Sequence, residues 1–298
     1  MFYYFAYNLN IVSELELPIL NRKLNIDNSK GTVYIKKKNK ISNLYSPKGN
    51  NFNLENAVIH RKYIGYFLIE NGEHIFFEKD GDPSKGDISR VILHQVFARV
   101  LFQRRLICFH ASALSINSKT ILFSGISGMG KSSLCAKLIG FEEKNFISED
   151  LTPIVEEENK YLAVPTFPFI KLDQTNKKEK FDLVRKINFD NERLSRDGYI
   201  IKEESMKDSL SEISSIIFLA WGKENNIKKL SSSEAFHRSL PNLFKPSINQ
   251  ENMESLKFLY DHLENLIHRV NFFVFERKKI FSEIDNQIDY LVKRIEEI

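Results

Sequence analysis

The feature that most constrains this chain is the octapeptide "GISGMGKS" at residues 125–132. It matches the pattern G-x-x-x-x-G-K-[ST] at every fixed position. The apolar stretch "TILF" precedes it, and a helix-like pattern that reaches Leu138 follows it. A strand, a glycine loop and a helix in this order are typical of a P-loop, which holds phosphate groups.

The residue types in this loop suit phosphate binding for physical reasons. Glycines let the backbone turn tightly, so successive amide N–H groups can point inward at phosphate oxygens, and the positive end of the following helix favours an anion. The lysine would reach the β- and γ-phosphates, and the serine hydroxyl would bind Mg²⁺. The alternative is a glycine-rich turn without a ligand, but both flanks favour nucleotide. The predicted nucleotide-binding residues are Gly125, Ile126, Ser127, Gly128, Met129, Gly130, Lys131, Ser132 and Ser133.

Two adjacent carboxylates, Glu149 and Asp150, follow in "NFISED". Asp150 comes 150 − 131 = 19 positions after Lys131, and only one short helix and one strand fit into that interval. The pair should therefore end the next strand, where adjacent side chains point to opposite sides. One carboxylate could hold a metal while the other activates an incoming hydroxyl. The alternative is an acidic strand end that faces solvent.

A histidine and two cysteines lie in apolar surroundings near the loop. His110, in "CFHASAL", is on the strand expected to pair with the strand before the glycine loop. It is either a core residue or a group beside the phosphates, and the sequence leaves both interpretations open. Cys108 and Cys135 have no metal-ligand spacing, so we expect buried free thiols rather than a disulfide or a metal site.

The remaining pattern predicts an α/β protein with two regions. Residues 1–85 are rich in β-branched and aromatic runs, and Asn71-Gly72 predicts a type I′ hairpin turn. Residues 86–298 would form the P-loop core. Apolar residues from Leu93 to Leu101 recur with helical spacing, and residues 281–295 predict an amphipathic terminal helix.

The charged stretch Thr175–Asp208 has no clear period. The simpler interpretation is a solvated loop, because charge runs usually face water. The functional interpretation is a lid that closes over the transferred phosphate, with Arg193 and Arg196 as the preferred cations.

Composition excludes several classes of function. The chain of 298 residues carries a formal net charge of +4, which is too weak to indicate nucleic-acid binding. No apolar run approaches the roughly 20 residues needed to span a bilayer, and the aromatic N-terminus lacks a cationic segment and a cleavage site. We therefore expect a cytoplasmic protein with neither a nucleic-acid nor a membrane partner.

The segment "FHASAL…TILFSGISGMGKSSL…NFISEDLTPI" resembles the HPr kinase/phosphorylase-like kinases. These share a histidine-containing strand, a P-loop and an acidic pair on the next strand. "NLNIVSELELPIL" and "VPTFPFIKL" are also similar to segments of stand-alone members. The resemblance covers most of the chain, but it is specific only from His110 to Ile154.

The resemblance implies a kinase core of HPr kinase/phosphoenolpyruvate carboxykinase type with a mixed sheet. It implies that Ser132 and Asp150 bind Mg²⁺, that Glu149 activates the hydroxyl, and that His110 lies beside the transferred phosphate together with Lys131. The family's usual pair is Asp-Asp, whereas here the first acid is Glu149. The glycine- and arginine-rich signature of the bifunctional enzymes is missing, so the resemblance does not extend to HPr as substrate or to the phosphorylase reaction.

The leading hypothesis is an Mg²⁺-ATP-dependent kinase that phosphorylates a hydroxyl, most simply a serine of a peptide or protein. Stand-alone members of the resembled family phosphorylate a precursor peptide in natural-product pathways, and related kinases often form homo-oligomers. Two alternatives stay open: a small-molecule hydroxyl kinase, and a nucleotide-binding sensor without transfer activity. The acid pair favours an enzyme, because a sensor needs no base.

Overall fold

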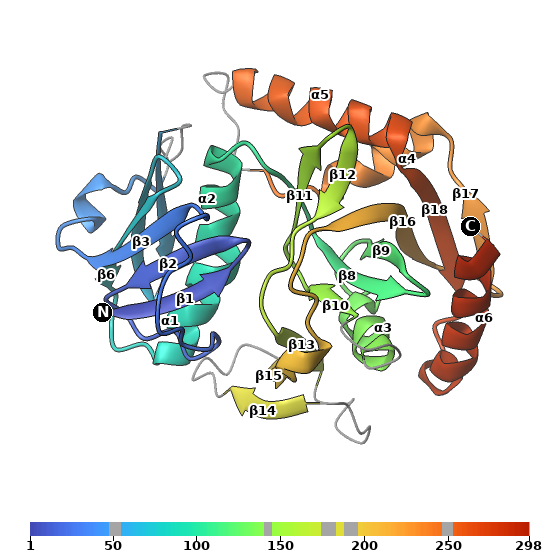
Figure 1. Cartoon of the computed structure of the whole chain (residues 1–298), viewed down its shortest axis with the longest axis horizontal. Coiled ribbons are helices and arrows are strands. Elements are labelled where there is room, and N and C mark those ends of the chain that lie inside the picture. Colours follow the sequence, from blue (N-terminus) through green and yellow to red (C-terminus); the bar gives the residue numbers. More distant parts are fainter. Residues whose placement is uncertain (48–54, 140–144, 174–182, 188–195, 246–252, 298) are drawn as a thin grey trace. The chain divides into compact units, whose positions relative to one another are not determined.

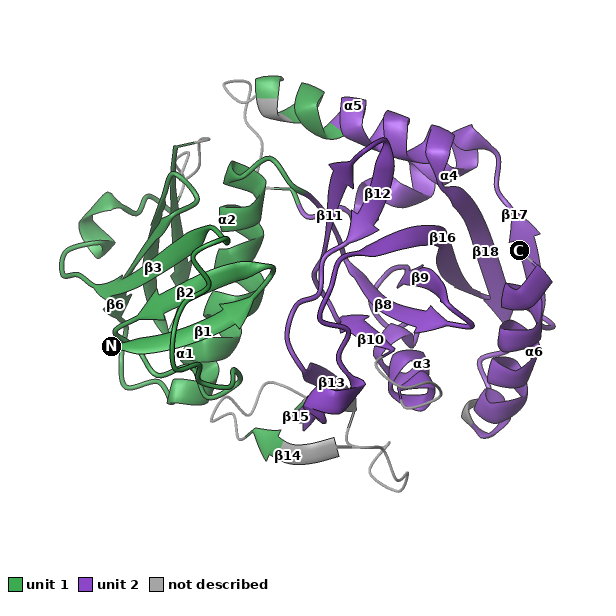
Figure 2. Ribbon diagram, in the orientation of Figure 1, with its two compact units in different colours: residues 1–106, 186–198, 245–259 green, residues 107–185, 199–244, 260–298 purple. Residues whose placement is uncertain are grey.

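The protein is a mixed α/β protein with mixed sheets in this computed structural model (Figure 1). The structure describes residues 1–47, 55–139, 145–173, 183–187, 196–245 and 253–297. The described chain groups into two compact units (Figure 2). Unit 1 comprises residues 1–106, 186–198 and 245–259, and unit 2 comprises residues 107–185, 199–244 and 260–298.

Unit 1 contains a six-stranded sheet in the order β1-β2-β3-β6-β5-β4. The β2–β3 and β3–β6 pairs are parallel, and the other pairs are antiparallel. Asn71, Gly72 and Glu73 join β5 to β6. Asn71 and Gly72 have φ values of +54° and +64°, and the Glu73 N–H donates to the Glu70 carbonyl, which confirms the predicted hairpin turn. The strands are β1 Phe2–Ala6, β2 Leu9–Ser13, β3 Thr32–Lys37, β4 Asn56–Arg61, β5 Gly65–Glu70 and β6 His74–Lys79.

A continuous helical segment packs on this sheet. It comprises α1 (Lys85–Val91), a π-helical turn (Ile92–Val96) and α2 (Phe97–Gln103). The predicted apolar face, Leu93 to Leu101, is buried, and the Tyr7 ring stacks on Phe97 with 5.0 Å between centroids. Unit 1 thus includes residues 86–106 together with the N-terminal sheet, whereas the sequence assigned them to the core. The division into domains 1–85 and 86–298 stays a prediction.

Unit 2 is built on a nine-stranded sheet. Its order is β10-β8-β9-β16-β12-β11-β7, and β18 extends it by pairing with β16 and β17. The sequence predicted one strand through His110, but the structure has two, because β7 and β8 separate at His110. The strands are β7 Ile107–Phe109, β8 Ala111–Ile116, β9 Lys119–Ser124, β10 Phe146–Ser148, β11 Thr152–Glu157, β12 Lys160–Ala163, β16 Ser211–Trp221, β17 Asn226–Lys229 and β18 Asn271–Arg277.

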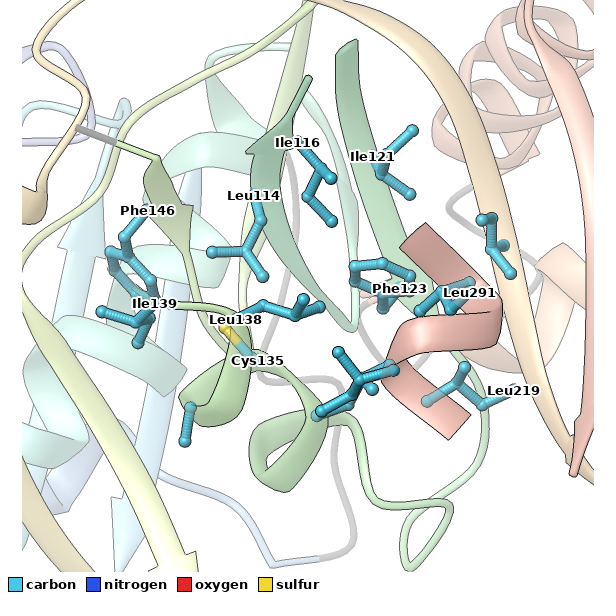
Figure 3. Close-up of a cluster of buried hydrophobic side chains, with 14 of the residues drawn as sticks. Leu114, Ile116, Ile121, Phe123, Cys135, Leu138, Ile139, Phe146, Leu219 and Leu291 are labelled. Atoms are coloured by element: carbon cyan, nitrogen blue, oxygen red, sulfur yellow. The ribbon is translucent and has the colours of Figure 1, made fainter. Parts of the chain in front are cut away.

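Two helices, α3 (Lys131–Leu138) and α6 (Ile284–Glu297), contribute to one buried cluster of unit 2. Apolar side chains of β8, β9, β16 and β18 meet α3 and α6 in this cluster (Figure 3). Phe123, Leu138 and Leu291 are fully buried, and burying such a side chain contributes about 1.5–3 kcal/mol. The amphipathic terminal helix predicted from the sequence is confirmed, with Ile288, Leu291 and Ile295 in the core.

The other helices are α4 (Ser232–Ser239) and α5 (Met253–Arg269). Ser231 and Glu234 form a capping box at the start of α4, in which each side chain bonds the backbone N–H of the other residue. A three-stranded sheet in the order β13-β15-β14 completes the fold, with β13 at Phe169–Asp173, β14 at Leu183–Ile187 and β15 at Arg196–Ile201. Strands β14 and β15 lie within the stretch that the sequence assigned to a loop or lid.

Candidate functional site

Four strands of unit 2 end at the same edge of the sheet. Strands β9, β16 and β18 are mutually parallel. Strand β10 runs antiparallel to β8, which runs antiparallel to β9, so β10 has the same direction as β9. The glycine loop follows β9 and the acid pair follows β10, so the topology brings both to this edge. The carboxyl ends of strands in an open α/β sheet are a common place for ligands.

The glycine loop takes backbone conformations that side chains disfavour. Gly125, Gly128 and Gly130 have φ values of +143°, +88° and +78°. A Cβ atom on Gly125 would lie 3.1 Å from the carbonyl oxygen of Leu219, so close approach to β16 also requires glycine there. Gly130 is the N-cap of α3, and Lys131 begins that helix. The three glycines are therefore explained by local backbone geometry.

Lys131 is buried and its ammonium group folds back onto the loop. Its Nζ atom donates to the carbonyl oxygens of Gly125, at 2.6 Å, and Ile126, at 3.5 Å. The charge thus lies within the turn of the glycine loop, at the N-terminus of α3. Both the lysine and the positive end of a helix attract an anion to this position.

Ser132 and Glu149 are directly connected. The Ser132 hydroxyl donates to Oε1 of Glu149 at 2.6 Å. Glu149 is 5% exposed, and its Oε2 atom is buried with no hydrogen-bond partner in the described part of the chain. Burial raises the pKa of this carboxyl above its ordinary value, the Lys171 charge lowers it, and the Asp150 charge raises it.

Asp150 has different partners from its neighbour. Its Oδ1 atom lies 3.0 Å from Nε2 of His110, and its Oδ2 atom accepts a hydrogen bond from the Lys171 ammonium at 2.5 Å. The side chains of Asp150 and His110 are 21% and 31% exposed, so both reach solvent more than Glu149 does. Asp150 has a φ of +69°, and the two carboxylates take separate positions through this turn rather than by strand alternation.

A second cation contacts the glycine loop. Arg277, the last residue of β18, is 4% exposed and donates through Nη2 to the carbonyl oxygen of Met129 at 2.6 Å. Its Nη1 atom donates to Oε1 of Gln287 at 2.8 Å. The guanidinium also lies over the Trp221 ring, 4.6 Å from the centroid. Burial lowers the pKa of Arg277 to about 10.

The structure brings together the sequence-predicted residues His110, Ser132, Glu149 and Asp150 around the glycine loop. Arg193 lies outside the described residues, and Arg196 begins β15 but its side chain also lies outside them. Lys171 and Arg277 were not predicted from the sequence. The available signal was a single cation within or at the end of an otherwise apolar strand, "FIKL" for Lys171 and "FFVFER" for Arg277.

Both cysteines are buried and free, as expected. Burial raises the pKa of both thiols, so neither is a ready thiolate at neutral pH. In the part of the chain that the structure describes, we find no helix with the length and apolar character to cross a bilayer.

Neither a protein-family model nor a curated protein sequence matches the chain. Among solved structures, the chain is similar to the Hpr(Ser) kinase/phosphatase from Coxiella burnetii, with a TM-score of 0.36 and 11% sequence identity over 64% of this chain and 88% of that chain. A TM-score of this size does not establish a shared fold, so the family assignment stays a prediction.

Proposed function

We propose that the protein is an Mg²⁺-ATP-dependent kinase that transfers the γ-phosphate to a hydroxyl group, in the simplest case a serine of a peptide or protein. The observation that carries this proposal is the convergence of two carboxylates on a glycine loop. Glu149 bonds Ser132 of the loop, and Asp150 lies beside it with Lys171 and His110. A loop that only binds nucleotide has no need of a second acid with its own cation.

The donor set fits a magnesium ion. Ser132 Oγ and Glu149 Oε1 lie 2.6 Å apart, and Oε2 of Glu149 is a buried oxygen without a partner among the described residues. Hydroxyl and carboxylate oxygens are the ligands that Mg²⁺ prefers, in combination with nucleotide phosphates. Bound there, the ion would neutralise charge on the phosphates. These contacts favour Glu149 over Asp150 as the metal ligand, which reverses the roles that the family resemblance implies.

Asp150 is the better placed base. Its side chain is more exposed than that of Glu149, so an acceptor hydroxyl can approach it from solvent. It would take the proton from that hydroxyl while the oxygen forms its bond to the γ-phosphorus and ADP departs. Lys171 donates to one oxygen of this carboxylate and His110 lies within hydrogen-bond distance of the other, so both side chains would orient the base toward the incoming hydroxyl.

The test separates the two acids. Mg²⁺-ATP binding is measured by calorimetry, and transfer is measured with γ-labelled ATP on a degenerate serine-containing peptide library and, separately, on glycerol. We expect Asp150→Asn to bind Mg²⁺-ATP normally and to lower kcat by about 10²–10⁴. Glu149→Gln should instead weaken Mg²⁺-ATP binding.

The control is Glu212→Gln, which removes an exposed acid of β16 that pairs with Lys160. It should leave both quantities unchanged. Transfer to glycerol alone would favour a small-molecule kinase, and ATP binding without transfer to any acceptor would favour a sensor. Full activity of Asp150→Asn would refute the assignment of the base.

A further inference from the structure

We infer that Arg277 is a positioning residue of the phosphate site, which orients the glycine loop by holding the carbonyl group of Met129. The inference rests on the proposed nucleotide binding and adds a residue that lies 148 positions from the loop residue it contacts. Trp221 lies against the same guanidinium, so its fluorescence can report on changes at this contact.

Arg277 orients the peptide group between Met129 and Gly130. The Met129 carbonyl accepts a 2.6 Å hydrogen bond from the Arg277 guanidinium. No peptide bond in the described chain is cis, and in a trans peptide group the C=O and N–H bonds point in opposite directions. The contact with Arg277 therefore turns the N–H group of Gly130 away from Arg277. That N–H donates no backbone hydrogen bond within the described residues, so it remains available to a ligand.

The Arg277 guanidinium fits closely against the glycine loop. A Cβ atom on Gly130 would lie 2.6 Å from Nη2 of Arg277. The guanidinium thus occupies the space that any larger residue at position 130 would need. The glycine serves both the positive φ of the helix N-cap and this contact.

Two neighbouring side chains, Gln287 and Trp221, support Arg277. Gln287, which is fully buried on α6, accepts from Nη1 through Oε1 and donates to the carbonyl oxygen of Lys278 at 3.0 Å. Trp221, at the end of the neighbouring parallel strand, covers the guanidinium plane. The side chain is therefore fixed from two directions, and the loop carbonyl is bound to a rigid group rather than to a mobile one.

The Arg277 guanidinium carries a buried charge. The guanidinium is 4% exposed and forms no ion pair with a carboxylate of the described chain, and its Nε atom has no hydrogen-bond partner there. Buried charges in proteins are normally paired, because desolvation is costly. A nucleotide phosphate bound to the Gly130 N–H would bring negative charge to the far side of the same peptide group, where it offsets the guanidinium charge without touching it. The positioning contact and the unpaired charge thus favour the same ligand class, a nucleoside di- or triphosphate.

The experiment uses the full chain and its only tryptophan, Trp221, as the reporter. Mg²⁺-ATP is titrated against intrinsic fluorescence and, independently, by calorimetry, for the wild type, Arg277→Lys, Arg277→Ala and the control Lys279→Met. Lys279 is an exposed cation 6.0 Å from the centroid of the same ring. We expect both Arg277 variants to raise the Kd for Mg²⁺-ATP about ten- to hundredfold, the usual range for a charge-assisted contact. The control should bind like the wild type.

Two further readouts distinguish positioning from folding. Guanidinium chloride at about 20 mM should restore binding to Arg277→Ala, whereas sodium chloride at the same concentration should not. Arg277→Lys keeps the charge but cannot hold Met129 and Gln287 together, so it should melt near the wild-type temperature and still bind weakly. If a folded Arg277→Lys variant bound Mg²⁺-ATP as tightly as the wild type, the role of Arg277 would be overturned while the proposed function would stand. Failure of the wild type to bind Mg²⁺-ATP would overturn the proposed function itself.

Discussion

Replacing Glu149 with glutamine should stabilise the protein when no metal is present. The carboxylate is buried, and one of its oxygens has no hydrogen-bond partner within the described chain. Leaving a buried polar group unsatisfied costs about 1–3 kcal/mol, and more when the group is charged. An amide retains the size of the side chain and an oxygen that can accept from Ser132. Its NH2 group would be as unpartnered as Oε2 is, so the gain comes from removing the buried charge. We therefore expect Glu149→Gln to raise the free energy of unfolding by about 1–3 kcal/mol in EDTA at pH 7.5.

The sign of the pH dependence follows from the raised pKa. The folded state holds a proton on Glu149 more tightly than the unfolded chain does. The stability that this proton provides is fully present below the unfolded-state pKa and is lost as pH rises through the folded-state pKa. Wild type and variant should accordingly be similar at pH 4, and the advantage of the variant should grow from there and level off once Glu149 is ionised in the folded state.

The assay is thermal unfolding in EDTA between pH 4 and pH 8. Each kcal/mol of unfolding free energy corresponds to a shift of about 2–4 °C in the melting temperature. Asp150→Asn is the matched control. Asp150 is bonded to Lys171 and His110, so its removal should cost about 1 kcal/mol rather than add stability. Added Mg²⁺ should stabilise the wild type and not Glu149→Gln. A variant that is less stable than the wild type at pH 7.5, or an advantage independent of pH, would refute the reasoning.

Two other predictions follow from single contacts. Lys131→Ala should weaken Mg²⁺-ATP binding by about 1.5–3 kcal/mol in calorimetry, because it removes a charge-assisted contact to the phosphates, and unchanged affinity would argue against phosphate binding by the loop. Gly72→Ala should lower the free energy of unfolding by about 1–3 kcal/mol in denaturant titrations. At that position φ is +64° and a Cβ atom would lie 2.9 Å from Cγ of Arg104, whereas Gly31→Ala, at a glycine without positive φ, should cost less.

The local features of the site could be read from the sequence. The glycine loop, the acid pair and the neighbouring histidine occupy one continuous region from His110 to Asp150. Their secondary structure follows from short-range signals: apolar runs for the strands, glycine for positive φ, and a lysine at the helix start. The hairpin at Asn71-Gly72 and the apolar face of α6 were predictable for the same reason, since turn chemistry and helical periodicity depend on nearby residues alone.

The strands within the stretch Thr175–Asp208 were not predictable in this way. Strands β14 and β15 depend on pairing in the three-stranded sheet, because neither "LVRKI" nor "RDGYII" alternates apolar and polar residues. Edge and peripheral strands are specified by their partners more than by intrinsic preference. The break of the predicted strand at His110 has a similar origin, because β7 pairs with β11 while β8 pairs with β9 and β10.

The sequence by itself thus determined that a glycine loop and two acids would lie close together, because they are near neighbours along the chain. Only the tertiary structure decided which acid faces Ser132 and which faces Lys171, since that choice depends on the turn at Asp150 and on a strand 21 residues away. It also decided that Arg277 lies against the loop. Parallel pairing of β9, β16 and β18 brings their carboxyl ends to one edge, and no local pattern encodes a contact made across three strands.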